Sequence, residues 1–153
     1  MIKNIIFISF IIIFISGCGY TPIYSKKDQN FKLGQIETLG NAKLNKTIIR
    51  NIKNFTDKNS NFNKIFNLKI ETNLNKNIKS KDTKGNPKTF EIKIVTNLIV
   101  NKDEPNSLKK SFSYSSIYNT LDSEFELNKY ENTIEKTLIS KISQKIIVYL
   151  QTL

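Results

Sequence analysis

The sequence predicts an α+β fold, a two-layer sandwich in which two helices pack on one face of a four-stranded, mostly antiparallel sheet. Three segments alternate apolar and polar residues with a period of two, which is typical of strands covered on one side. Two other segments carry apolar residues at the spacing of an amphipathic helix. Their order along the chain predicts strand, helix, three strands, helix.

The first strand and the first helix are expected close together. The strand covers residues 31–37 and is weakened by Gly34, since glycine has no side chain to pack. The helix is expected after Gly40, with Asn41 as its N-cap, and the polar segment 57–63 is expected to end it. The apolar residues of this helix share one face: Leu44, Ile48, Ile52 and Phe55.

The three alternating segments are predicted to form a meander, over residues 66–74, 90–100 and 112–118. Gly85-Asn86-Pro87 and Pro105-Asn106-Ser107 lie between them and are typical of turns. Each segment has an apolar face and a mostly polar face, so we expect both helices on the apolar side. The polar face, which includes Lys93 and Asn97, is either solvated or covered by a partner.

The last helix is predicted to begin at the capping box Ser123-Glu124-Phe125-Glu126 and to continue nearly to Leu153. About 25 residues give a helix of roughly 38 Å, long enough to cross the whole sheet. Its apolar stripe is Leu127, Tyr130, Ile134, Leu138, Ile142, Ile146 and Leu150.

Residues 1–17 are predicted to be an export signal. Lys3 supplies a positive start, and the apolar run 5–15 would span only roughly 16 Å as a helix, against about 30 Å for a bilayer core. Ile15-Ser16-Gly17 leads into Cys18, the only cysteine, and the four residues resemble a bacterial lipobox. That resemblance implies lipidation of the Cys18 thiol, cleavage before it and acylation of the new amino terminus. The alternative is an ordinary residue ending a leader that is not lipidated.

The rest of the chain has the size of one domain. Residues 18–30 are predicted to form a lipidated tether, and 31–153 the folded domain. Pro22 and its aromatic neighbours suggest that the tether is extended and docks locally, whereas the alternative is a disordered linker.

The net charge of +11 suggests a phosphate-bearing partner such as an anionic glycolipid. Only Arg50 among the 24 basic residues is an arginine, although bidentate phosphate sites favour the guanidinium group. The alternative is a solvated surface whose lysines reflect an AT-rich genome. The export signal argues against nucleic acid as a partner.

The residue content argues against an enzyme. The chain has no histidine, its one cysteine is assigned to the anchor, and neither a glycine-rich phosphate loop nor a nucleophile elbow is present. Asp122, Glu124 and Glu126 are explained by the positive end of the last helix. We therefore expect no catalytic residue, no metal site and no cofactor.

The opening of the mature chain carries a family resemblance. Cys18-Gly19-Tyr20-Thr21-Pro22-Ile23-Tyr24 is similar to the Cys-Gly-aromatic-x-Pro-aliphatic-Tyr opening of the LPS-assembly lipoproteins, the LptE family, in its alphaproteobacterial form. The element order fits, and the stretch 114–150 resembles their C-terminal region. The resemblance implies a lipid-anchored subunit on the periplasmic side of the outer membrane, since Gly19 is not an aspartate. Such subunits plug the LptD β-barrel, assist its assembly and bind lipopolysaccharide.

For contact with the glycolipid, the candidate residues lie in the loop predicted between the second and third strands: Lys76, Lys79, Lys81, Lys84 and Lys88. Clustered ammonium groups would meet lipid A phosphates and core sugars, whereas the alternative is a solvated hairpin tip. A second function also fits the sequence, a lipid-anchored adaptor or auxiliary component of another cell-envelope lipid-transport complex. The two differ in partner, an outer-membrane barrel in the first and an inner-membrane ATPase or periplasmic complex in the second.

Overall fold

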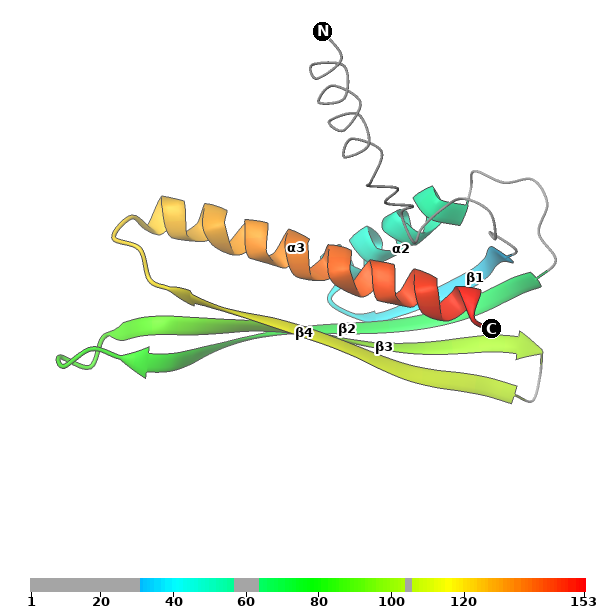
Figure 1. The fold of residues 1–153 in the computed structure, drawn as a ribbon, viewed down its shortest axis with the longest axis horizontal. Helices are drawn as coiled ribbons and strands as arrows, with labels where there is room; N and C mark the ends of the chain where they lie inside the picture. The colour runs from blue at the N-terminus through cyan, green and yellow to red at the C-terminus, as the bar shows by residue number, and fades with distance from the viewer. Residues whose placement is uncertain (1–30, 57–63, 104–105) are drawn as a thin grey trace, which may run out of the picture.

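The structure is a computed structural model that describes residues 31–56, 64–103 and 106–153. Its elements are β1 (Phe31–Gly40), α2 (Ala42–Thr56), β2 (Lys64–Lys81), β3 (Pro87–Asp103), β4 (Asn106–Asn119) and α3 (Glu124–Gln151). The strands form one sheet in the order β1-β2-β3-β4, with β1 parallel to β2 and the other pairs antiparallel. Both helices lie on one side of the sheet (Figure 1), which confirms the predicted α+β sandwich and its element order.

Several predictions lie outside the described residues: the export signal 1–17, Cys18, the tether 18–30, the helix-ending segment 57–63 and part of the second turn. No helix within the described ranges has the length and apolar character needed to cross a bilayer.

The connection from β1 into α2 is set by two neighbouring residues. Gly40 has a φ of 77°, and a Cβ there would lie only 2.4 Å from the Thr72 carbonyl oxygen, so the position requires glycine. The Asn41 side-chain oxygen then accepts a hydrogen bond of 3.1 Å from the Leu44 amide, as predicted for an N-cap. This crossover returns the chain to the sheet as β2, parallel to β1.

The strands of the meander are longer than the sequence predicts, and β2 reaches Lys81 instead of Leu74. The prediction of a long basic loop was therefore wrong: Lys76, Lys79 and Lys81 belong to β2, Lys88 belongs to β3, and only Lys84 lies in the turn. Pairing with β3 continues through this polar half of the hairpin, because backbone hydrogen bonds do not require an apolar side-chain pattern.

The core lies between the sheet and the two helices. Its fully buried side chains include Phe66, Ile70, Ile94 and Leu98 from the sheet, Ile48 and Ile52 from α2, and Ile142 and Ile146 from α3. The apolar stripe of α3 is wider than predicted, because Ile139 and Ile147 are buried as well. Tyr130, predicted within that stripe, is exposed.

Candidate functional site

The five candidate lysines lie on a hairpin that projects beyond the helices. Figure 1 shows β2 and β3 extending past the start of α3 to a turn at the end of the molecule opposite the C-terminus. Asp82 holds the turn, since its Oδ1 accepts hydrogen bonds from the amides of Lys84 at 2.9 Å and Asn86 at 2.8 Å. The bond from the Asn86 amide contributes most to lowering the pKa of Asp82 below its ordinary value of 3.8. The turn itself, predicted around Gly85, is thereby confirmed.

The five candidate lysines fall into two groups. Lys76 Nζ lies 2.6 Å from Glu131 Oε1, and Lys79 Nζ lies 3.3 Å from Glu91 Oε2, so both already have carboxylate partners. The other three are exposed and form no ion pair with a described residue: Lys81, Lys84 and Lys88. These three, which we call the tip lysines, are the ammonium groups that an anionic ligand would meet first.

Lys76 belongs to a network that fixes the base of the hairpin to α3. Glu131 Oε1 also accepts a hydrogen bond of 2.7 Å from Tyr118 Oη. Burial of Tyr118, together with its bond to that carboxylate, raises the pKa of the phenol above its usual 10.0. The Tyr118 ring packs on Phe90 at 5.7 Å between ring centres, and Lys76 Nζ lies 4.7 Å from the centre of the Phe90 ring. Lys76 is therefore a positioning residue of the hairpin.

Exposed apolar side chains occur at the same end of the molecule. Ile78 lies in the hairpin, and Leu121 and Phe125 lie where β4 turns into α3. The Thr120 amide donates to the Lys88 carbonyl at 3.0 Å, which ties this connection to the hairpin. Phe125 is 73% exposed. The sequence analysis did not predict that ammonium and apolar groups lie together here. The one sequence signal for it was that Phe125 lies outside the apolar stripe of the last helix.

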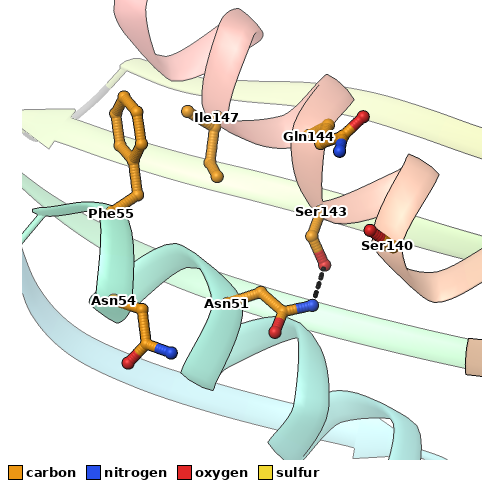
Figure 2. A pocket seen from close by; sticks show the side chains of 7 residues that line it. All are labelled: Asn51, Asn54, Phe55, Ser140, Ser143, Gln144 and Ile147. Atoms are coloured by element: carbon orange, nitrogen blue, oxygen red, sulfur yellow. Dashed lines mark hydrogen bonds between the residues drawn. The ribbon is translucent and has the colours of Figure 1, made fainter. Parts of the chain in front are cut away.

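A different groove, between α2 and α3, has a volume of about 350 Å³. Asn51 Nδ2 donates to Ser143 Oγ at 3.2 Å across it, and its other lining residues include Asn54, Phe55 and Gln144 (Figure 2). Among the described residues that line this groove none is charged, and such a lining does not favour a phosphate group.

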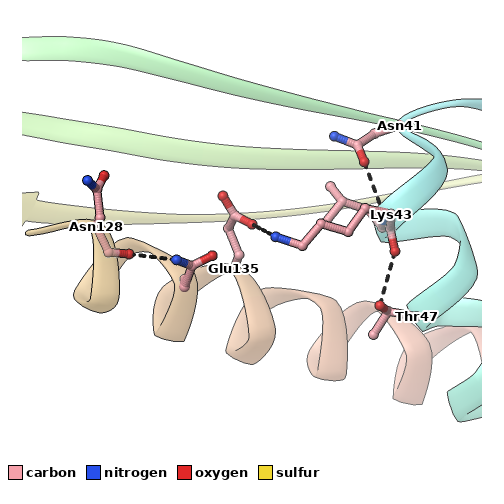
Figure 3. Close-up of polar contacts among 7 residues, drawn as sticks. Asn41, Lys43, Thr47, Asn128 and Glu135 are labelled. Atoms are coloured by element: carbon pink, nitrogen blue, oxygen red, sulfur yellow. Dashed lines mark hydrogen bonds and ion pairs between the residues drawn. The ribbon is translucent and has the colours of Figure 1, made fainter. Parts of the chain in front are cut away.

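The two helices are also joined at their surface. Lys43 Nζ of α2 lies 3.8 Å from Glu135 Oε2 of α3 (Figure 3). Within α2, Thr47 Oγ1 donates a hydrogen bond of 3.1 Å to the Lys43 carbonyl. These contacts have structural roles on the helix side of the sandwich.

The face of the sheet away from the helices is mostly polar, as predicted, although it also exposes Ile65 and Ile117. Its exposed residues are mostly neutral: Asn67, Asn73, Asn75, Asn97, Asn101, Ser111, Ser113 and Ser115. Charged residues are present too, including the exposed Lys93. The asparagine and serine side chains of this face can donate and accept hydrogen bonds.

A metal centre is not found in the part of the chain that the structure describes, where no three acidic, histidine or cysteine side chains come together. The candidate site is the surface formed by the tip lysines and the exposed apolar residues beside them, Ile78, Leu121 and Phe125.

No family model matches the chain, and no curated protein matches it. Solved structures do. Rare lipoprotein B from Shewanella oneidensis matches with a TM-score of 0.62 at 12% identity, over 78% of this chain and 95% of that one. A minor lipoprotein from Acinetobacter baumannii matches with a TM-score of 0.60 at 12% identity, over 81% and 92%. Lipoprotein B from Nitrosomonas europaea matches with a TM-score of 0.54 at 16% identity, over 78% and 83%. At these identities the similarity establishes a shared fold.

Proposed function

We propose that this chain is an outer-membrane lipoprotein of the LptE type, a non-catalytic subunit of the lipopolysaccharide translocon. In this role it plugs an LptD-type β-barrel from the periplasmic side, assists the assembly of the barrel and binds lipopolysaccharide. The observation that carries the proposal is the fold shared with rare lipoprotein B and a minor lipoprotein over most of the chain. The lipobox-like segment ending at Cys18 independently supports a lipid anchor.

The polar face of the sheet supports a place inside a barrel. Barrel interiors are polar, and a surface facing one must exchange hydrogen bonds with water for hydrogen bonds with the wall. Asparagine and serine side chains do this without burying charge, which would carry a larger desolvation penalty. Asn73, Asn97 and Ser113 lie on this face and are exposed.

The barrel partner is tested by affinity purification from envelope membranes, with a photo-crosslinker in place of Lys93 or Asn97. The proposal predicts that an LptD-type barrel is trapped from this face. Recovery of an inner-membrane ATPase or a periplasmic complex instead would favour the adaptor function and overturn the proposal. Cys18→Ser is expected to release the protein from the membrane, and a product that stays membrane-bound with the same cleavage site would exclude the lipid anchor.

Lipopolysaccharide binding is assigned to the tip lysines, with Lys76 and Lys79 positioning the hairpin. A lysine beside an anionic lipid surface contributes about 1 kcal/mol, and 1.4 kcal/mol is a tenfold change in affinity. Reversing all three charges (Lys81→Glu, Lys84→Glu, Lys88→Glu) is therefore expected to weaken binding to purified lipopolysaccharide at least tenfold.

The control for this experiment reverses three other exposed lysines that form no ion pair with described residues: Lys46, Lys53 and Lys136. Both variants change the net charge by the same amount, so a general electrostatic effect would weaken binding equally in the two. Equal affinities would remove the tip lysines from the site.

A further inference from the structure

β4 forms an open edge of the sheet. It pairs with β3 from Asn119 opposite Thr89 to Ser107 opposite Asn101 without a shift of register, and no described strand pairs with its other side (Figure 1). In an antiparallel ladder, residues point their backbone N–H and C=O groups alternately to the two sides of a strand. About half of these groups along β4 therefore face away from the sheet.

This edge carries little of the protection that natural edge strands have. Charged residues, prolines and bulges are the usual devices against unwanted pairing. The segment 111–119 contains no charged residue and no proline, and its pairing is regular. At the opposite edge, β1 is interrupted by a register shift between Leu33 and Ile36. The β4 edge is thus better suited than the β1 edge to pair with an added strand.

A pocket of about 220 Å³ lies between this edge and α3. It is lined by Ser115 and Ser116 of β4 and, among others, Thr137, Leu138 and Lys141 of α3. Successive residues of a strand point to opposite faces. A pocket that touches both serines and no residue of β3 therefore opens at the free side of β4. A strand added there would place one of its side chains against Leu138.

The charges along this edge are positive. Lys109 and Lys110 at the start of β4 and Lys141 above it are exposed and form no ion pair with a described residue. The carboxylates of Glu131 and Glu135, which lie on the same helix as Lys141, are paired instead with lysines of β2 and α2. A second copy of this chain would bring like charges together here, whereas an acidic segment would be attracted.

We propose that β4 is an acceptor strand, to which the barrel partner adds an extended, acidic segment with one apolar side chain in the pocket beside α3. This inference rests on the proposed function for the identity of the partner. Backbone hydrogen bonds would supply the affinity, and the pocket and the lysines would supply the specificity.

The test uses the lipoprotein co-expressed with the LptD-type barrel of the same genome and purified through a tag on the lipoprotein. Amide hydrogen exchange is measured residue by residue in the free protein and in the complex. Strand addition predicts at least tenfold slower exchange at every second amide between Ser111 and Asn119 in the complex. The amides between them, already bonded to β3, should change little. Docking through side chains alone would not produce this alternation.

The acidic character of the segment is tested with the double variant Lys110→Glu, Lys141→Glu. Its recovery of the barrel should fall at least tenfold, whereas the control Lys46→Glu, Lys136→Glu, with the same change of charge, should recover the barrel as the unaltered protein does. Equal recovery by the two variants would overturn an acidic partner segment.

The remaining outcomes separate the two proposals. If no barrel accompanies the unaltered lipoprotein, the proposed function fails and this inference fails with it. If the complex forms but the β4 amides exchange as fast as in the free chain, only the acceptor strand is refuted. Protection of these amides in the free protein that rises with its own concentration would assign the edge to a second copy, and this also refutes the barrel segment.

Discussion

The Glu131 carboxylate is expected to hold the base of the β2–β3 hairpin against α3, and Glu131→Gln tests this role. One oxygen of the carboxylate accepts from Lys76 Nζ at 2.6 Å and from Tyr118 Oη at 2.7 Å. The Glu131 side chain is only 14% exposed. The substitution keeps the shape and a neutral acceptor for Tyr118 but removes the negative charge.

The expected cost follows from the two bonds. A hydrogen bond to a charged group contributes about 1.5–3 kcal/mol and a neutral one about 1 kcal/mol, so the bond from Tyr118 should weaken by about 1 kcal/mol. Lys76 is 39% exposed, and solvent screening limits its share to less than about 1 kcal/mol. Glu131→Gln should therefore lower the free energy of unfolding by about 1–2 kcal/mol.

Urea unfolding measures this value, and Glu135→Gln is the matched control one turn further along α3. Glu135 pairs with Lys43 at 3.8 Å, and the Lys43 side chain is 75% exposed, so the control should cost less than about 0.5 kcal/mol. A double-mutant cycle with Lys76→Met should give a coupling of about 0.5–1 kcal/mol with Glu131. Equal losses in the two glutamine variants, or zero coupling, would refute the structural role given to Lys76.

Three further predictions concern the sheet and its connections. Thr72→Val or Thr96→Val alone should lower the free energy of unfolding in urea by about 1–3 kcal/mol, because each breaks the buried 3.0 Å hydrogen bond between the two hydroxyls and leaves one of them unpaired. The double variant leaves no hydroxyl unpaired and should be less destabilised than either single variant. Gly40→Ala should cost about 2 kcal/mol or more by the same measurement, since its Cβ meets a carbonyl oxygen at 2.4 Å. Gly85→Ala, whose Cβ meets nothing within 4 Å, should cost about half as much. Because the pKa of Tyr118 is raised in the folded protein, its neutral phenol stabilises the fold fully below pH 10. Above pH 10 the free energy of unfolding should fall by up to about 1.4 kcal/mol per pH unit. Tyr118→Phe should remove this contribution to the pH dependence.

The fold was predictable from sequence in the segments where one face of a strand is buried against the helices and the other is exposed. Phe66, Leu68 and Ile70 alternate with polar residues because they face the helices, and the same is true of Ile92 and Ile94. The polar extension of the β2–β3 hairpin was not predictable, because β2 after Leu74 continues as Asn-Lys-Asn-Ile-Lys-Ser-Lys with no apolar period. Its strand conformation comes from pairing with β3, which no local pattern reports.

The candidate site was predicted in composition but not in geometry. The sequence indicated five lysines, yet it gave no sign that Lys76 is paired with a carboxylate 55 residues away. A pair between a strand and a helix depends on how the two elements cross, and sequence spacing along a single element does not contain that information. Tyr130 is exposed for a similar reason: its surroundings depend on how α3 crosses the sheet, and its ring meets only the edge of the core, at Tyr118, 6.0 Å away between ring centres.

The parallel pairing of β1 with β2 and the length of β2 support the proposed function. β1 and β2 are parallel, and Phe31 pairs with Lys64, so both strands start at the end of the sheet nearest the tether in sequence. From there to Lys81 a strand advances about 3.3 Å per residue, or roughly 55 Å in total. The hydrocarbon core of a bilayer is about 30 Å thick. In the proposed role, with its strands along the lumen of a barrel, β2 is thus long enough to carry the tip lysines across the membrane. A parallel β1–β2 pair directs the hairpin tip away from Phe31, whereas an antiparallel pair would return the end of β2 toward it.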